Sequence, residues 1–143
     1  MAYRTIWETN GICVRYSGHS SDREIALLVH EFQADERFDN VRYILHDFRD
    51  CENLTYSKLA IEELSAIDAA AAMSKPEHRV AVVSDRPDVL GMVKAYMDTG
   101  FQAKDQLRIF SSLEAARSWA CVYAGLIGGA DHTVTDTEAR AFA

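Results

Sequence analysis

The sequence predicts a single α/β domain built on a mixed five-stranded sheet with about four helices, and three observations support this prediction. Two alternating segments flank Asn10-Gly11, a dipeptide preferred in two-residue turns, so the chain is expected to open with a β-hairpin. Two apolar runs, Val41 to Phe48 and Val80 to Val83, are typical of parallel strands buried on both faces. Segments with helical periodicity alternate with these runs, which favours helices packed on a largely parallel sheet.

Each element follows from its local pattern. The hairpin strands are expected at Tyr3 to Thr9 and Ile12 to Tyr16, where apolar residues cluster on either side of the turn. A first helix is expected from the capping residues Ser20, Ser21 and Asp22 as far as Asp35, because apolar residues there recur at i, i+3, i+4 and i+7. Its inward-facing residues are predicted to be Ile25, Leu28, Val29 and Phe32.

The second half of the chain repeats the alternation of strand and helix. Proline, glycine and serine mark its boundaries, since they terminate or cap helices. The predicted elements are a helix from Ser57 to Met73, a strand from Arg79 to Ser84, a helix from Pro87 to Gly100, a strand from Leu107 to Phe110 and a helix from Ser111 to Tyr123. The sequence therefore divides into a domain at residues 1–124 and a polar tail at residues 125–143, with one short helix expected near Thr135.

Composition excludes several function classes. The 143 residues carry a formal charge of -7, and no basic stripe is present, so nucleic acid is not an expected partner. No secretory signal and no 18-residue apolar span occur, which favours a cytoplasmic protein without stable membrane insertion. The cysteines Cys13, Cys51 and Cys121 are odd in number and lack CxxC spacing, so they are expected to be reduced thiols.

Charged residues follow the two apolar runs and define the predicted functional surface. In open α/β sheets, sites form at the carboxyl ends of the strands, so a contact surface is expected there. Its candidate residues are Asp47, Arg49, Asp50, Ser84, Asp85 and Arg86. The three aspartates could instead hold a divalent cation, but pairing with Arg49 and Arg86 is the simpler expectation, and no metal site is predicted.

No catalytic signature stands out, and the protein is not predicted to be an enzyme or to need a cofactor. The sequence lacks a glycine-rich phosphate loop, a nucleophile elbow and metal-binding histidine spacing. His46 alone attracts attention, because it precedes Asp47 in the strand and faces the opposite side of the sheet. A hydrogen-bonded, partly buried histidine is the expectation for that position.

Four segments carry a resemblance to a known family: Trp7 with Asn10-Gly11, Tyr43 to Asp50, His78 to Asp85, and Ile109 to Trp119. Together they resemble the SpoIIAA-like family, which is related to the STAS domain of anti-sigma-factor antagonists. The resemblance extends over residues 3–120. It implies a SpoIIAA/STAS-like fold and a non-enzymatic, regulatory or protein-interaction role in a bacterial protein.

The resemblance also implies candidate phosphorylation positions. In antagonist-type STAS domains, a partner kinase phosphorylates a serine at the start of the helix after the central strand, and by position Thr55 or Ser57 corresponds to it. The Asp-Ser-Ser-Gly run of the antagonists is replaced here by the residues from Asp50 to Ser57. Either hydroxyl could simply cap the helix instead.

A second hypothesis is a site for a small apolar ligand or a lipid. Small and flexible residues face each other across the second and third helices, which can leave a cleft. The candidate cleft residues are Met73, Met92, Tyr96 and Met97. Close helix packing is the alternative, because alanine lets helices approach a sheet. Self-association through the hairpin edge is also left open.

Overall fold

Five strands in the described part of the chain form one mixed sheet, in the spatial order β1-β2-β3-β4-β5. The computed structural model describes residues 3–74, 78–100 and 106–123. The strands are β1 (Tyr3–Trp7), β2 (Gly11–Ser21), β3 (Tyr43–Thr55), β4 (Arg79–Val83) and β5 (Leu107–Phe110). β1 pairs antiparallel with β2, and the remaining neighbours pair in parallel. The predicted α/β architecture with a leading hairpin is therefore confirmed.

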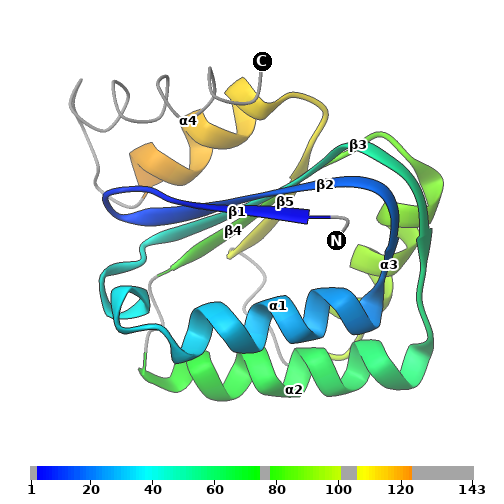
Figure 1. The fold of residues 1–143 in the computed structure, drawn as a ribbon, viewed down its shortest axis with the longest axis horizontal. Coiled ribbons are helices and arrows are strands. Elements are labelled where there is room, and N and C mark those ends of the chain that lie inside the picture. The colour runs from blue at the N-terminus through cyan, green and yellow to red at the C-terminus, as the bar shows by residue number, and fades with distance from the viewer. Residues whose placement is uncertain (1–2, 75–77, 101–105, 124–143) are drawn as a thin grey trace.

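Helices cover both faces of this sheet (Figure 1). They are α1 (Asp22–Ala34), α2 (Lys58–Ser74), α3 (Pro87–Asp98) and α4 (Leu113–Tyr123), with a short 3-10 helix, η1, at Glu36–Asn40. Because strand order advances in one direction and crossovers between parallel strands are right-handed, α1, α2 and α3 all fall on one face. The helix α4 packs on the opposite face, so the molecule has three layers.

Local capping explains where the helices begin. The hydroxyl of Ser21 accepts a hydrogen bond from the Glu24 amide, and Ser112 does the same for Ala115 at the start of α4. Pro87 occupies the first turn of α3, where its missing amide hydrogen costs nothing. Gly100 follows that helix with a φ of 76°, a left-handed conformation that glycine adopts most readily.

The two faces of the sheet bury different cores. The four residues predicted to face inward from α1 are all buried, and they meet a large apolar cluster with α2, α3 and η1. The α4 face holds a smaller cluster that includes Tyr43, Leu45 and Ala116. A Cβ at Gly11 would lie only 2.2 Å from the Tyr43 ring, so this ring packs directly on backbone. All three cysteines are buried, and none of them forms a disulfide bond.

The strands β2 and β3 extend past the rest of the sheet. β1 pairs with β2 only as far as Tyr16, and β4 pairs with β3 only as far as Asp47, whereas the β2–β3 ladder continues to the pair Ser21↔Thr55. This two-stranded ribbon bends toward the starts of α1 and α2 (Figure 1). The predicted end of the central strand at Phe48 was therefore wrong, because β3 runs seven residues further along its partner.

Candidate functional site

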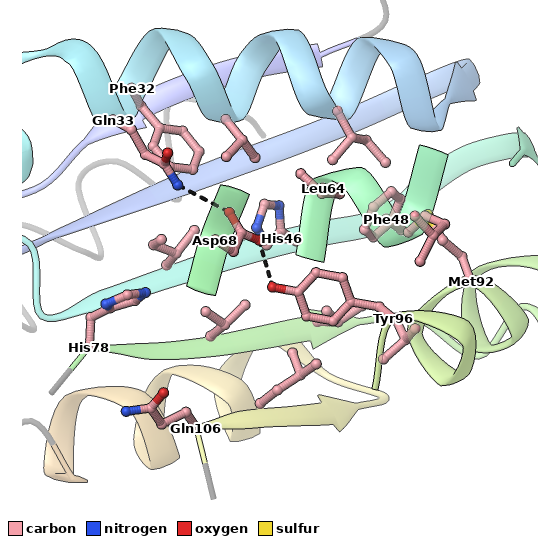
Figure 2. A pocket seen from close by; sticks show the side chains of 18 residues that line it. Phe32, Gln33, His46, Phe48, Leu64, Asp68, His78, Met92, Tyr96 and Gln106 are labelled. Carbon is pink, nitrogen blue, oxygen red and sulfur yellow. Dashed lines mark hydrogen bonds between the residues drawn. The ribbon is translucent and has the colours of Figure 1, made fainter. Parts of the chain in front are cut away.

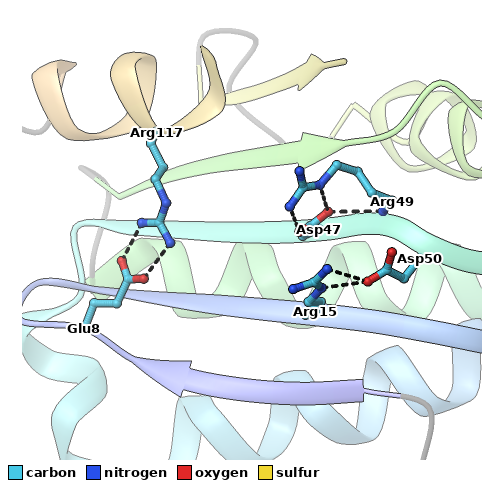
Figure 3. A network of polar contacts seen from close by, with 6 residues as sticks. All are labelled: Glu8, Arg15, Asp47, Arg49, Asp50 and Arg117. Carbon is cyan, nitrogen blue, oxygen red and sulfur yellow. Dashed lines mark hydrogen bonds and ion pairs between the residues drawn. The ribbon is translucent and has the colours of Figure 1, made fainter. Parts of the chain in front are cut away.

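The predicted contact surface is divided between the two faces of the sheet. Asp47 is buried on the α4 face, where Arg49 binds its two carboxylate oxygens with nitrogen–oxygen distances of 2.9 and 2.8 Å. Next to this pair on β2, Arg15 forms an ion pair with Asp50 at 2.6 Å (Figure 3). Each carboxylate therefore has its own arginine, and these strand residues form a paired charged patch.

A second buried ion pair on the same face was not predicted from the sequence. Arg117 of α4 donates to both carboxylate oxygens of Glu8, at 2.9 and 2.8 Å, and the Tyr43 hydroxyl donates to the same carboxylate. Burial and the neighbouring Glu8 charge raise the pKa of Tyr43. Glu8 and Arg117 are 109 residues apart in sequence, so no local pattern reveals their contact. The network fixes α4 against the hairpin.

The start of α2 holds the predicted phosphorylation candidates. The Ser57 hydroxyl accepts a hydrogen bond from the Ala60 amide at 3.2 Å, so Ser57 caps the helix. Its own amide donates to the Asp22 carboxylate at 2.6 Å, which joins the starts of α1 and α2. Thr55 is exposed at the end of β3.

The start of α3 lies beside these residues. The buried Ser84 hydroxyl accepts from the Arg86 amide, and the Arg86 guanidinium forms an ion pair with Asp88. Arg86 was expected to pair with one of the aspartates Asp47, Asp50 and Asp85, but it pairs with Asp88 instead, because the first turn of α3 places Asp88 within reach; Asp85 is exposed. The Asp88 carboxylate also accepts from the Leu54 amide at 3.0 Å, which connects β3 to α3. Hydrogen bonds from the Arg86 guanidinium and from the Leu54 and Val89 amides hold the pKa of Asp88 below its usual range.

Exposed apolar side chains accompany these polar groups. Tyr56 is 41% exposed, Leu59 66% and Leu90 36%. The Tyr56 hydroxyl lies against Gly91, since a Cβ there would be 2.7 Å from it, so Tyr56 rests on the first turns of α3. We call this region the helix-start surface, and it consists of Thr55, Tyr56, Ser57, Leu59, Arg86 and Leu90.

A cavity of about 80 Å³ lies between the sheet and the helices α1, α2 and α3 (Figure 2). Its walls are largely apolar, with aromatic rings from Phe32 and Phe48 and with polar groups that converge from several elements. Of the predicted cleft residues, Met92 and Tyr96 line it. Met73 and Met97 do not, because they are 87% and 43% exposed on the outer sides of their helices.

Asp68 of α2 is the central polar group of this cavity. Its carboxylate accepts hydrogen bonds from the Gln33 amide group at 3.0 Å and from the Tyr96 hydroxyl at 2.6 Å. Burial raises the pKa of Asp68 to about 6, and the two hydrogen bonds partly oppose that effect. Sequence reasoning missed Asp68, since an aspartate beside four alanines in a helix gives no signal of burial.

His46 lines the same cavity from the sheet. Its Nδ1 lies 2.9 Å from the Tyr16 hydroxyl, so it is hydrogen-bonded and partly buried. Burial lowers the pKa of His46 to about 4, so the ring is neutral at pH 7. A neutral histidine and an aspartate that is mostly ionised therefore face one small cavity.

Two further properties of the described residues bear on function. Within residues 3–74, 78–100 and 106–123, no cluster of three or more histidine, cysteine, aspartate or glutamate side chains could hold a metal ion. In the same parts of the chain, no helix combines the length and the apolar character needed to cross a bilayer. The predicted polar tail and its short helix lie outside the described residues.

Comparison with solved structures identifies the fold. The unphosphorylated anti-sigma factor antagonist SpoIIAA matches with a TM-score of 0.52 and 12% identity, over 80% of this chain and 92% of that one. The phosphorylated Bacillus cell fate determinant SpoIIAA matches with a TM-score of 0.50 and 14% identity, over 82% and 99% of the chains. The protein has a SpoIIAA-like, STAS-type fold.

One further solved structure also matches the chain, with a lower TM-score. An uncharacterised protein of the DUF3478 family from Shewanella loihica PV-4, described as having a SpoIIAA-like fold, matches at 13% identity with a TM-score of 0.45, over 84% of this chain and 93% of that one. No protein-family model and no curated protein matches the sequence.

Proposed function

We propose that this protein is a non-enzymatic, regulatory domain that acts by binding another protein through the helix-start surface. The observation that supports this proposal most directly is the exposure of Tyr56, Leu59 and Leu90 beside Arg86. Aromatic and arginine side chains such as Tyr56 and Arg86 are enriched at the centres of protein interfaces, the exposed leucines add apolar contact area beside them, and polar groups such as Ser57 and Thr55 are typical of the rims. The fold agrees with such a role, since the matched SpoIIAA structures are of an anti-sigma factor antagonist.

The surface also has a rigid base, which favours recognition of a partner. Hydrogen bonds join Ser57 to Asp22 and Leu54 to Asp88, so the starts of α1, α2 and α3 are held together. A surface that is already ordered loses little conformational entropy when a partner binds. The paired charges Asp47–Arg49 and Arg15–Asp50 lie on the other face, and we assign them to the margin of the contact region.

Thr55 and Ser57 are candidates for regulation of this surface by phosphorylation. SpoIIAA has been solved in phosphorylated and unphosphorylated forms, which makes a hydroxyl near the start of α2 the natural position to test. A phosphate at Ser57 would meet the positive end of the α2 dipole, but also the Asp22 carboxylate 2.6 Å from the Ser57 amide. At Ser57 the helix dipole would attract the phosphate and the Asp22 carboxylate would repel it. Thr55 has no such carboxylate on its amide among the described contacts, so we infer that it is the less hindered phosphate acceptor.

The test compares single substitutions at two exposed positions of the same helix. Leu59→Arg alters the helix-start surface, and Met73→Arg is the matched control, because Met73 is exposed near the other end of α2. Tagged variants are incubated with an extract of the host, and captured proteins are quantified by mass spectrometry. We expect a partner that the wild type and Met73→Arg capture and that Leu59→Arg loses.

Either of two results would contradict the proposal: identical capture by all three proteins, or equal loss with both substitutions. Circular dichroism must show the same helix content in each variant, so that loss of binding is not loss of folding. Thr55→Glu and Ser57→Glu then test regulation. If both bind the partner as the wild type does, the phosphorylation hypothesis fails while the interaction surface stands.

A further inference from the structure

Among the described residues, the carboxylates of Glu8 and Asp47 are buried and that of Asp68 is partly buried, and the three differ in how they are neutralised. Glu8 is paired with Arg117, and Asp47 is paired with Arg49. Asp68 forms no ion pair within the described residues: its hydrogen bonds there come from the neutral groups of Gln33 and Tyr96, and the charge of His30 acts on it only weakly, from outside ion-pair distance. Buried charges are normally paired, because an unpaired one loses its hydration without electrostatic compensation. Of these three described carboxylates, Asp68 is therefore the one without an ion pair.

The space next to Asp68 is suited to a cation. Each carboxylate oxygen accepts one hydrogen bond and keeps capacity for another. The rings of Phe32, Phe48 and Tyr96 line the same cavity, and aromatic faces attract cations. Two histidines, His46 and His78, lie in the cavity wall, and His46, which is on the sheet beside Tyr16, is neutral at pH 7 and does not repel a positive charge. The negative charge of Asp68, its open acceptor positions and the aromatic wall therefore all favour a cationic ligand that donates hydrogen bonds.

The size of the cavity limits that ligand. Its volume is about 80 Å³. An engineered apolar cavity of about 150 Å³ holds benzene, with six non-hydrogen atoms, so this one accommodates about three or four. Pockets that hold drug-sized ligands measure about 300 to 1,000 Å³. A lipid chain is at least as large as such a ligand, so it does not fit in this cavity.

We propose that the cavity between the sheet and the helices α1, α2 and α3 binds a small primary alkylammonium ion, with its ammonium group on Asp68 and its short alkyl chain against the apolar wall. The ammonium donates to the open positions of the carboxylate, and the Tyr96 and Gln33 contacts hold that carboxylate in place. This site is separate from the helix-start surface, so it does not depend on the proposed protein-binding function.

The experiment uses three probes of similar size and different charge: propylammonium, 1-propanol and propionate. Each is titrated at pH 7.5 into the isotope-labelled full-length protein, and NMR shifts of cavity residues such as Leu64 and Met92 are followed. We expect saturable shifts with propylammonium, in the millimolar range because few atoms make contact. Propionate is expected to give none, and 1-propanol at most weak shifts.

Two variants test the role of the carboxylate. Asp68→Asn keeps the size of the side chain and removes the charge, and it is expected to weaken propylammonium binding at least about tenfold. Asp98→Asn makes the same change at an exposed position of α3 and is expected to leave the affinity unchanged. The proposal is overturned if no probe shifts the cavity resonances, if 1-propanol binds as tightly as propylammonium, or if Asp68→Asn retains the affinity of the wild type.

Discussion

The two titratable groups of the cavity should give the folding stability a pH dependence that only single variants reveal. Burial raises the pKa of Asp68 from 3.8 to about 6 and lowers that of His46 from 6.5 to about 4. Each group is thus harder to ionise in the folded protein than in the unfolded chain. We predict that lowering the pH increases the contribution of Asp68 to the free energy of unfolding and decreases that of His46. The two changes nearly cancel in the wild type.

The signs follow from which state holds the proton. As pH rises from 3.8 to 6, the unfolded chain releases the Asp68 proton while the folded protein keeps it, so this contribution to the free energy of unfolding decreases. As pH falls from 6.5 to 4, the unfolded chain takes up a proton at His46 before the folded protein does, so that contribution also decreases. At about 1.4 kcal/mol per pKa unit, each amounts to about 3 kcal/mol over its interval.

Asp68→Asn isolates the first contribution, and His46→Asn isolates the second while retaining a polar group near Tyr16. Relative to wild type, Asp68→Asn should gain up to about 3 kcal/mol as pH rises from 4 to 7. His46→Asn should show the reverse, with its relative stability highest near pH 4. Any constant loss from altered packing shifts a whole curve and leaves its slope unchanged.

Urea unfolding followed by tryptophan fluorescence measures these free energies between pH 4 and pH 8, with Trp7 and Trp119 as the probes. Acidic groups elsewhere, such as Asp88, titrate equally in all three proteins and cancel in the differences. If the difference between Asp68→Asn and wild type does not vary with pH, the carboxylate is not buried as described and the reasoning is refuted.

Three further substitutions probe the fold. Ser57→Ala removes the cap of α2 and should cost about 1 kcal/mol in urea unfolding, whereas an unchanged midpoint would mean that the Ser57 hydroxyl does not cap the helix. Glu8→Gln leaves Arg117 buried without its counter-charge and should cost about 3 to 5 kcal/mol; a loss under about 1 kcal/mol would show that the pair is hydrated. Gly11→Ala places a methyl group against the Tyr43 ring and should lower stability by about 1 to 3 kcal/mol in thermal unfolding, and a neutral result would show that the ring moves freely.

The local elements of this fold could be predicted because their signals are local. Asn10-Gly11 marked the position of the hairpin, although Gly11 already begins β2 and the turn residues are Thr9 and Asn10, and serine residues marked the starts of α1, α2 and α4. These signals depend on the conformations of a few consecutive residues, which the sequence alone largely determines. The order of strands and helices, and from it the layered α/β class, followed from such signals and from apolar periodicity.

Contacts between distant segments could not be predicted in the same way. The polar residues from Arg49 to Asn53 suggest a loop, yet they continue β3 because the end of β2 pairs with them. The Glu8–Arg117 ion pair joins opposite ends of the described chain. In both cases the deciding partner lies far away in sequence, so only the assembled sheet and its layers bring the groups together.

The cavity shows most clearly which features the sequence predicts and which depend on contacts between distant segments. The apolar faces of α1 and α3 were evident from the sequence, and they correctly placed Met92 and Tyr96 next to the sheet. Asp68 was not evident, because its burial depends on Gln33 and Tyr96, which are 35 and 28 residues away. The sequence by itself determined the elements and their inward faces, since helix and strand periodicity are local properties. Only the tertiary structure decided that a carboxylate is enclosed between three helices and a sheet, because that depends on how those faces pack.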